Sequence, residues 1–351
     1  MSETLLIYGA NGYTGTLIAR LAAEQGLRPV LAGRNAPALA QLAAQLGCPF
    51  RVAPLGDAAA LDEAVRDVAV VLHCAGPFAE TARPMAEACL RARAHYLDIT
   101  GEVAVFEALA GRDVQARAAG IMMMPGVGFD VVPSDCLARY LAEQLPGAQH
   151  LTLAFQASGG VSWGTASTAI ESLPQPGMAR EKGRLVNLPA PRARSFDFGN
   201  GPVAATSIAW GDLATAFRST GIPNIEVYAA LGTAAQRLMA LTAPLRPLFA
   251  SRAARSLLRR AVRLAPRGPS DAARAGGECL LWGEVTDAAG TRRAARLRTP
   301  EAYTLTAHTA LAIARRALAG DAPPGFQTPA CAYGADFILQ FPGVLRTDMA
   351  F

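Results

Sequence analysis

Lysine is almost absent from this chain of 351 residues: of its 33 basic residues, only Lys182 is a lysine. Short-chain reductases use a tyrosine four positions before a lysine, but Met178 stands four positions before Lys182, so that arrangement is excluded. The formal net charge is +5. Because basic and aromatic residues are not interleaved, this charge does not indicate nucleic-acid binding.

Long apolar runs and clustered metal ligands are also missing. No stretch approaches the roughly 18 to 20 apolar residues of a membrane-spanning helix. The four histidines do not stand at ligand spacings, so we expect no bound metal. A strand expected from Thr4 leaves no room for a signal peptide, and we expect a cytoplasmic protein. Six dispersed cysteines are expected to be reduced thiols: Cys48, Cys74, Cys89, Cys136, Cys279 and Cys331.

The first third of the chain alternates short β-prone runs with Ala/Leu-rich helical patterns. This alternation is typical of an α/β fold in which helices cover both faces of a doubly wound parallel sheet. The six expected strands cover residues 4–8, 29–33, 50–54, 68–73, 95–99 and 121–125.

After Pro125 the pattern changes to longer β-rich segments separated by Gly and Pro, with one expected helix at 164–173. The runs 278–285 and 292–298 predict a hairpin. We therefore expect a second, α+β domain of mostly antiparallel strands, which a homodimer interface could use. The predicted domains are 1–128, 129–299 and a helical segment, 300–351, that returns toward the first domain.

Two further segments have recognisable helical patterns. Thr299 and Pro300 stand in the order favoured for an N-cap and a first helical residue, which predicts a helix from Pro300 to Leu318. Residues 234–269 contain eight arginines and no acid. This segment is either a solvated arginine face over an apolar stripe or a weak contact surface for an anionic membrane or an acidic partner.

The turn GANGYTG, residues 9–15, follows the first expected strand and precedes a helix. Backbone N–H groups and the positive end of a helix dipole meet there, and together they attract a pyrophosphate. Gly9 permits a tight turn, Gly12 permits close ligand approach, and Gly15 permits helix-strand packing. Because the spacing is a variant of G-x-G-x-x-G, the strand-turn-helix context carries the interpretation.

The end of the second strand reads LAGRN and has no acid. NAD enzymes tend to carry Asp or Glu there for the ribose hydroxyls, whereas Arg34 can bind a 2′-phosphate. The sequence therefore favours NADP over NAD. The fourth strand ends in HCAGPF, which should border the nicotinamide. The candidate cofactor-binding residues are Gly9, Ala10, Asn11, Gly12, Tyr13, Thr14, Gly15, Arg34, Asn35, Cys74, Ala75, Gly76, Pro77 and Phe78.

These motifs, with residues 74–102, MPGVGFDVVPSD (124–135), 210–228 and 327–341, resemble the saccharopine dehydrogenase-like family of NADP-binding oxidoreductases, in its trans-acting enoyl reductase branch. The resemblance implies an N-terminal Rossmann domain, a second domain with the substrate, and nicotinamide-dependent redox chemistry. It implies cofactor contacts by Gly9, Gly12, Gly15 and Arg34. We expect a small-molecule or acyl substrate, because no set of arginines suited to saccharopine carboxylates is visible.

Hydride transfer also needs a proton source or an electrostatic stabiliser. Candidates at the strand ends are Tyr96, Asp98, Glu102 and Asp130, with Ser134 nearby. Asp98 and Asp135 could instead cap helices, and Glu102 could brace the domain hinge. Two hypotheses remain: an NADP-dependent reductase of a carbonyl or enoyl compound, or a non-catalytic NADP(H)-binding sensor or partner protein.

Overall fold

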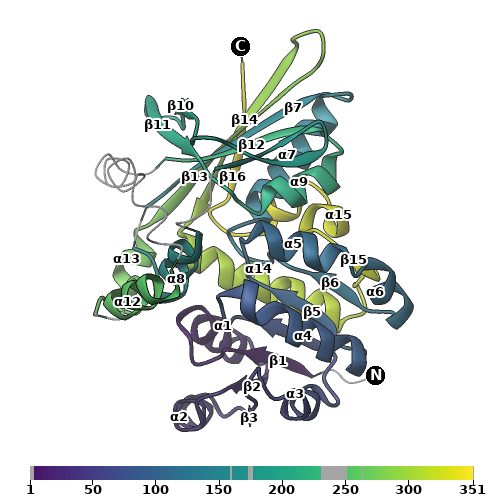
Figure 1. The fold of residues 1–351 in the computed structure, drawn as a ribbon, viewed down its shortest axis with the longest axis vertical. Helices are drawn as coiled ribbons and strands as arrows, with labels where there is room; N and C mark the ends of the chain where they lie inside the picture. The colour runs from purple at the N-terminus through teal and green to yellow at the C-terminus, as the bar shows by residue number, and fades with distance from the viewer. Residues whose placement is uncertain (1–3, 159, 173–176, 231–250, 263, 351) are drawn as a thin grey trace. The chain divides into compact units, whose positions relative to one another are not determined.

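The structure is a computed structural model that describes residues 4–158, 160–172, 177–230, 251–262 and 264–350. The chain divides into two compact units. The first unit runs to Val132 and includes Tyr303–Ala332, and the second comprises Pro133–Ala302 with the residues from Tyr333 onward. Figure 1 gives the element labels used below.

The first unit is built on a parallel sheet of seven strands in the order β15-β6-β5-β4-β1-β2-β3. Burial on both faces explains why strands such as LLIY are continuously apolar. The six strands expected from the sequence are all present, and β15 adds a seventh. The strands are β1 (Leu5–Tyr8), β2 (Val30–Gly33), β3 (Phe50–Val52), β4 (Val70–His73), β5 (His95–Asp98), β6 (Met122–Met124) and β15 (Gly325–Phe326).

Helices connect these strands and flank the sheet (Figure 1). From β1 the chain proceeds through β2 to the edge strand β3, and then returns to β4 on the other side of β1. This reversal between β1 and β4 is a topological switch point, beyond which ligands bind in open α/β sheets. The helices of this unit are α1 (Tyr13–Glu24), α2 (Ala36–Leu46), α3 (Ala58–Val65), α4 (Phe78–Ala92), α5 (Val103–Ala110), α6 (Asp113–Ala119) and α14 (Ala302–Leu318), the last from Tyr303 onward.

The second unit contains a mixed sheet with the path β10-β11-β12-β7-β13-β14-β16, to which β8 and β9 are attached. Only the β12–β7 pair is parallel among the paired strands described. Its strands are β7 (His150–Ala157), β8 (Met178–Glu181), β9 (Arg184–Asn187), β10 (Ala193–Asp197), β11 (Pro202–Ser207), β12 (Asn224–Ala229), β13 (Glu278–Thr286), β14 (Arg292–Pro300) and β16 (Leu345–Met349). Its helices are α7 (Val132–Gln144), α8 (Trp163–Ser172), α9 (Asp212–Thr220), α12 (Arg252–Val262) and α13 (Asp271–Ala275), and the short α15 (Pro329–Tyr333) spans the boundary between the units.

An aromatic cluster forms one core of the second unit. Phe196 packs against Tyr228 and Trp282, with ring centroids 5.0 and 4.9 Å away. Arg194 stacks over Phe196 and pairs with the buried carboxylate of Glu284 at 3.1 Å. Strand β10 therefore packs back over β13, although the two lie far apart in the sheet path.

The expected parallel sheet and second α+β region are confirmed, whereas one helix boundary is wrong. Thr299 and Pro300 are not the start of a helix, because β14 stays paired with β13 as far as the Glu278–Pro300 pair. A proline is tolerated at a strand end. The helix α14 begins only at Ala302. Three short strands, β8, β15 and β16, had no distinct sequence signal.

Candidate functional site

The turn between β1 and α1 lies at the switch point of the first unit. Gly9 has a φ of 77°, and a Cβ there would stand 2.9 Å from the Cβ of Ala75. A Cβ on Gly15 would stand only 2.3 Å from the Gly9 carbonyl oxygen, so α1 packs directly on the turn. The Thr16 hydroxyl donates to the Ala10 carbonyl at 2.9 Å and holds the first turn of the helix in place.

The N-terminus of α1 differs from those of the next three helices. Asn35 caps α2 by accepting from the Ala38 N–H at 3.1 Å, and Asp57 caps α3 in the same way at 3.0 Å. The carboxylate of Glu102 accepts from the first N–H groups of α4. The N-cap of α1 is Gly12, which has no side chain to accept these N–H groups, and its first turn has no acid. This helix end therefore suits an external anion.

Arg34 lies exposed immediately after β2. Its charge acts on the neighbouring Tyr8, whose pKa is raised to about 12 by burial against the opposing effect of Arg34. The side-chain oxygen of the next residue, Asn35, accepts from the Ala38 N–H and caps α2. A guanidinium at this place is available for the 2′-phosphate of a bound dinucleotide.

The end of β4 carries His73 and Cys74. His73 is fully buried, its Nε2 lies 3.1 Å from the Thr81 hydroxyl, and burial lowers its pKa to about 3. Burial, with a smaller effect of the Asp98 charge, raises the pKa of the Cys74 thiol far above its usual range. Neither group is suited to ionise at neutral pH, so the surroundings of Cys74 fit the expected reduced thiol.

Asp98 holds the loops at the ends of β5 and β6 together. Its carboxylate accepts from the Tyr96 hydroxyl at 2.6 Å, the Thr100 N–H at 2.9 Å and the Gly126 N–H at 3.0 Å. Burial raises its pKa to about 6, while these hydrogen bonds lower it and the charge of Glu102 raises it further. Asp98 does not cap a helix, and it and Tyr96 are positioning residues.

Glu102 caps α4, although it lies 24 residues after the first residue of that helix. Its two carboxylate oxygens accept from the N–H groups of Phe78 at 2.7 Å and Ala79 at 2.9 Å. The residues between 78 and 102 form α4 and β5, so this contact has no local sequence signal. Glu102 therefore fixes the turn after β4, which lies next to the Gly9 turn through Ala75.

Asp130 follows β6 in the loop before α7. Burial raises its pKa from 3.8 to about 7, and the negative charge of Glu102 adds to this shift. Its Oδ2 would stand 3.0 Å from a Cβ on Gly101, so an alanine there would require the Asp130 side chain to shift by a few tenths of an ångström. The four acid-base candidates of the sequence thus lie in one network, and Asp130 is the member suited to exchange a proton near neutral pH.

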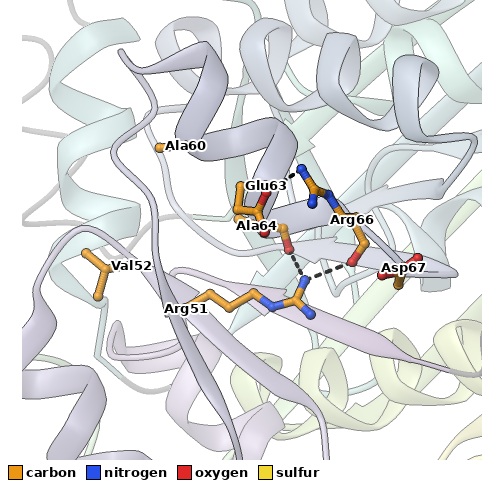
Figure 2. A pocket seen from close by; sticks show the side chains of 7 residues that line it. All are labelled: Arg51, Val52, Ala60, Glu63, Ala64, Arg66 and Asp67. Atoms are coloured by element: carbon orange, nitrogen blue, oxygen red, sulfur yellow. Dashed lines mark hydrogen bonds and ion pairs between the residues drawn. The ribbon is translucent and has the colours of Figure 1, made fainter.

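A hollow of about 470 Å³ beside β3 and α3 is separate from this network. Figure 2 shows that Arg51 points toward the carboxyl end of α3, where it donates to the carbonyls of Ala64 at 2.6 Å and Arg66 at 2.9 Å. Glu63 pairs with Arg66. These side chains stabilise the end of α3.

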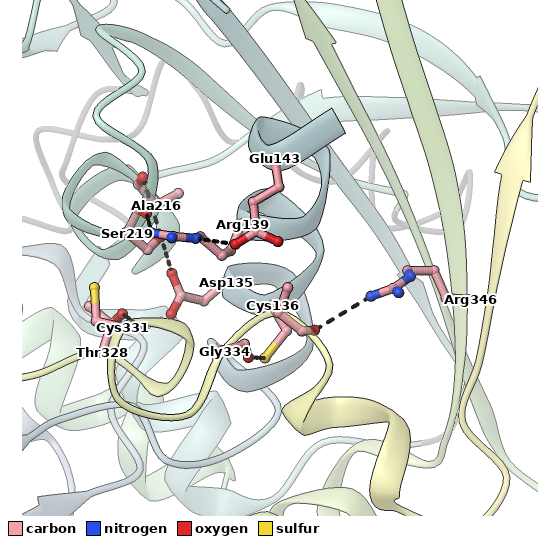
Figure 3. Close-up of polar contacts among 11 residues, drawn as sticks. Asp135, Cys136, Arg139, Glu143, Ala216, Ser219, Thr328, Cys331, Gly334 and Arg346 are labelled. Atoms are coloured by element: carbon pink, nitrogen blue, oxygen red, sulfur yellow. Dashed lines mark hydrogen bonds and ion pairs between the residues drawn. The ribbon is translucent and has the colours of Figure 1, made fainter. Parts of the chain in front are cut away.

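Asp135 has a structural environment in the second unit. Figure 3 shows it on α7, where it accepts from the Ser219 hydroxyl on α9 at 2.6 Å. Arg139, one turn later, donates to the Ser219 carbonyl at 2.8 Å and pairs with Glu143 at 2.6 Å. Asp135 therefore joins α7 to α9.

Among the described residues, no cluster of three or more His, Cys, Asp or Glu could hold a metal ion. Within the same parts of the chain, no helix is both long and apolar enough to cross a membrane.

Together, the doubly wound sheet and the glycine turn at its switch point have the architecture of the dinucleotide-binding units found in nicotinamide-dependent oxidoreductases. Residues 5–124 match the family model for the saccharopine dehydrogenase NADP-binding domain. The resemblance expected from the motifs is confirmed, and the match supports NADP as the cofactor of this unit.

The chain is similar over part of its length to curated proteins. It is 29% identical to a mouse saccharopine dehydrogenase-like oxidoreductase, over 41% of this chain and 38% of that protein. It is 30% identical to a trans-acting enoyl reductase of Mycobacterium ulcerans, over 53% of this chain and 48% of that protein. The matched regions thus span less than half the length of either relative.

One solved structure is similar over nearly the whole chain. Apo saccharopine dehydrogenase (L-Glu forming) of Saccharomyces cerevisiae aligns with a TM-score of 0.66, over 99% of this chain and 100% of that one, at 12% identity. This similarity confirms the two-part α/β architecture and supports no statement about substrate.

We predict that Gly15→Ala destabilises the first unit and weakens dinucleotide binding. The added methyl group would approach the Gly9 carbonyl oxygen to 2.3 Å, and a displaced turn should cost about 1–3 kcal/mol. Urea unfolding and NADPH titration measure the two effects. Gly164→Ala in α8 is the matched control, because its nearest neighbour lies at 3.5 Å and alanine favours a helix. A neutral Gly15→Ala would contradict the close packing.

We predict that Asp130→Asn becomes more stable than the wild type as pH rises. The folded protein holds the Asp130 proton more tightly than the unfolded chain does, so wild-type stability falls between about pH 4 and the folded pKa of about 7. Asparagine does not titrate. At about 1.4 kcal/mol per pKa unit, a shift from 3.8 to about 7 makes the stability difference grow by up to roughly 4 kcal/mol and level off above pH 7.

Urea unfolding of both proteins across this pH range measures the difference. Asp321→Asn, which changes an exposed carboxylate in the same unit, should show no such rise. A flat difference for Asp130→Asn would mean that the Asp130 pKa is not raised in the folded protein.

Proposed function

We propose that this chain is an NADPH-dependent reductase that reduces the carbonyl or enoyl group of a small or acyl substrate. One observation carries the proposal: the N-terminus of α1, at the switch point of the sheet, lacks the side-chain cap that its neighbours have. The curated relatives named as oxidoreductases and enoyl reductases support the reaction class.

Different residues of the first unit bind different parts of the cofactor. The N–H groups at the start of α1 bind the pyrophosphate, since Gly12 and Gly15 leave the backbone accessible and tightly packed. Arg34 binds the 2′-phosphate through a charge-assisted pair. The turn from Cys74 to Phe78, fixed by Glu102, borders the nicotinamide end. NADPH, when bound, supplies a hydride.

Asp130 is the proposed proton donor. The reduction adds a hydride to the acceptor carbon and a proton to the carbonyl oxygen or to the α-carbon of an enoyl group, so one proton must come from the site. With a pKa of about 7, the Asp130 carboxyl is protonated in part of the molecules at neutral pH. Asp98 and Glu102 are held by hydrogen bonds within the protein, and they position the strand ends instead.

A second candidate is a non-catalytic NADP(H)-binding sensor or partner protein. In its favour, Tyr96, Asp98 and Glu102 all make hydrogen bonds that hold the fold together.

We also propose that the protein is cytoplasmic, that it forms a homodimer, and that residues 234–269 contact a membrane. The first part of that segment lies outside the described chain, because residues 231–250 are not described.

We predict that Arg34→Ala lowers the affinity for NADPH by about 10- to 100-fold and leaves the weaker NADH affinity nearly unchanged, because only NADPH carries the 2′-phosphate. Fluorescence titration of each nucleotide measures both constants. Arg20→Ala removes an exposed arginine of α1 and should change neither. Equal loss of both nucleotides would contradict the assignment of Arg34, and no binding to the wild type would remove the cofactor proposal.

We predict that the wild type oxidises NADPH in the presence of a 2-enoyl thioester or an aliphatic ketone, with deuterium from [4-²H]NADPH appearing in the product. Asp130→Asn should lower this rate by about 10²-fold and keep NADPH affinity, because only the proton donor is lost. The wild-type rate should fall as pH rises through about 7, where Asp130 loses its proton. Nucleotide binding without turnover of any acceptor would favour the sensor.

A further inference from the structure

Three of the most exposed large apolar side chains in the described residues lie close to α8 and α12. The exposed fractions are 90% for Leu264, 69% for Leu257 and 62% for Val161. Figure 1 shows α8, α12 and α13 grouped in the second unit. Single exposed leucines are common on protein surfaces, but a group on one helix face indicates a contact surface.

The helix α12 presents an outward face that repeats at helical spacing. Leu257, Arg260, Ala261 and Leu264 stand at positions i, i+3, i+4 and i+7, and all four are exposed. Leu264 lies just past the end of α12, where its N–H donates to the Ala261 carbonyl at 3.0 Å and continues the turn. These four residues are called the leucine face.

Contacts to α8 hold the leucine face outward. The Trp163 indole N–H donates to the Ala265 carbonyl at 2.8 Å, and the Trp163 backbone N–H donates to the Arg267 carbonyl at 3.1 Å. The Arg267 guanidinium stacks over the Trp163 ring, with 5.6 Å to its centroid. Leu264 is therefore presented next to a tryptophan that is anchored by its polar edge.

The described chain that carries the leucine face has charges of one sign. Residues 251–262 and 264–270 contain five arginines and no aspartate or glutamate, and the next acid, Asp271 in α13, pairs with Arg274 at 2.6 Å. Arg260 lies between the two leucines on the face and is exposed. Protruding leucines interleaved with arginines fit a surface that is anionic at the top and apolar beneath, which is the interface of a bilayer containing acidic lipids.

We propose that the leucine face, together with Val161, seats the second unit on the surface of an anionic lipid bilayer, with the leucines inserted among the acyl chains and the arginines at the headgroups. The contact is peripheral and separate from the dinucleotide turn of the first unit. It would bring substrates with lipid-like acyl chains close to the protein. The membrane contact does not depend on the proposed reductase activity.

The test is flotation of the full-length protein with vesicles of phosphatidylcholine alone or mixed with phosphatidylserine. We expect binding to the mixed vesicles only, weakened by salt because the arginine contribution is screened. Leu257→Ser and Leu264→Ser should each lower the vesicle partition about tenfold, and Arg260→Gln about fivefold. Val114→Ser, which removes an equally exposed valine on α6 of the first unit, should leave it unchanged.

Each opposite result overturns the proposal. These are equal binding to both kinds of vesicle, no binding to either, or leucine variants that partition like the wild type. Binding of poly-glutamate without binding of vesicles would assign the surface to an acidic protein partner instead. NADPH titration of the same variants separates this surface from the cofactor site, because the leucine variants should bind NADPH normally.

Discussion

The first unit depends on how the N–H groups at its helix starts are satisfied. Four helices begin in succession after β1 to β4, and each presents N–H groups without a partner in the helix. Side chains of Asn35, Asp57 and Glu102 accept these groups at α2, α3 and α4. At α1 the N-cap is a glycine. Three of these four helix ends are thus capped by side chains, and the end at the switch point is not. Because α5 and α6 also lack a side-chain cap, the position of the α1 end at the switch point is what marks it as the candidate site.

The hydrogen bonds of Glu102 to α4 also affect which carboxyl groups are available as proton donors. Its carboxylate is committed to α4, and its charge contributes to the raised pKa values of Asp98 and Asp130. Asp98 accepts from three donors and holds together the loops that follow β5 and β6. Asp130 has the higher pKa of the two. Burial therefore raises the pKa of Asp130, and the charge of the structural carboxylate Glu102 adds to that shift.

Much of this fold could be predicted from local sequence. Buried strands of a parallel sheet are continuous apolar runs, so β1 and β4 could be predicted from local sequence. Contacts between distant residues could not be predicted this way. Glu102 reaches Phe78 across a helix and a strand, and β15 joins β6 from about 200 residues later in the chain. The Thr299-Pro300 pair had the right local order for a helix start, but pairing of β14 with β13 overrode it.

The arginines of this chain, which has one lysine, have several different roles. These roles differ in how exposed the guanidinium group is. Arg194 lies against Phe196 and Trp282 and pairs with buried Glu284, so its planar guanidinium works as part of a core. Arg51 closes the end of α3 through two carbonyls. Arg34 and Arg260, by contrast, are exposed. Net charge alone cannot distinguish such roles, because a guanidinium that is committed to carbonyls or carboxylates attracts no partner. The exposed arginines beside the glycine turn and on α12 are those whose positions point to anions from outside the chain.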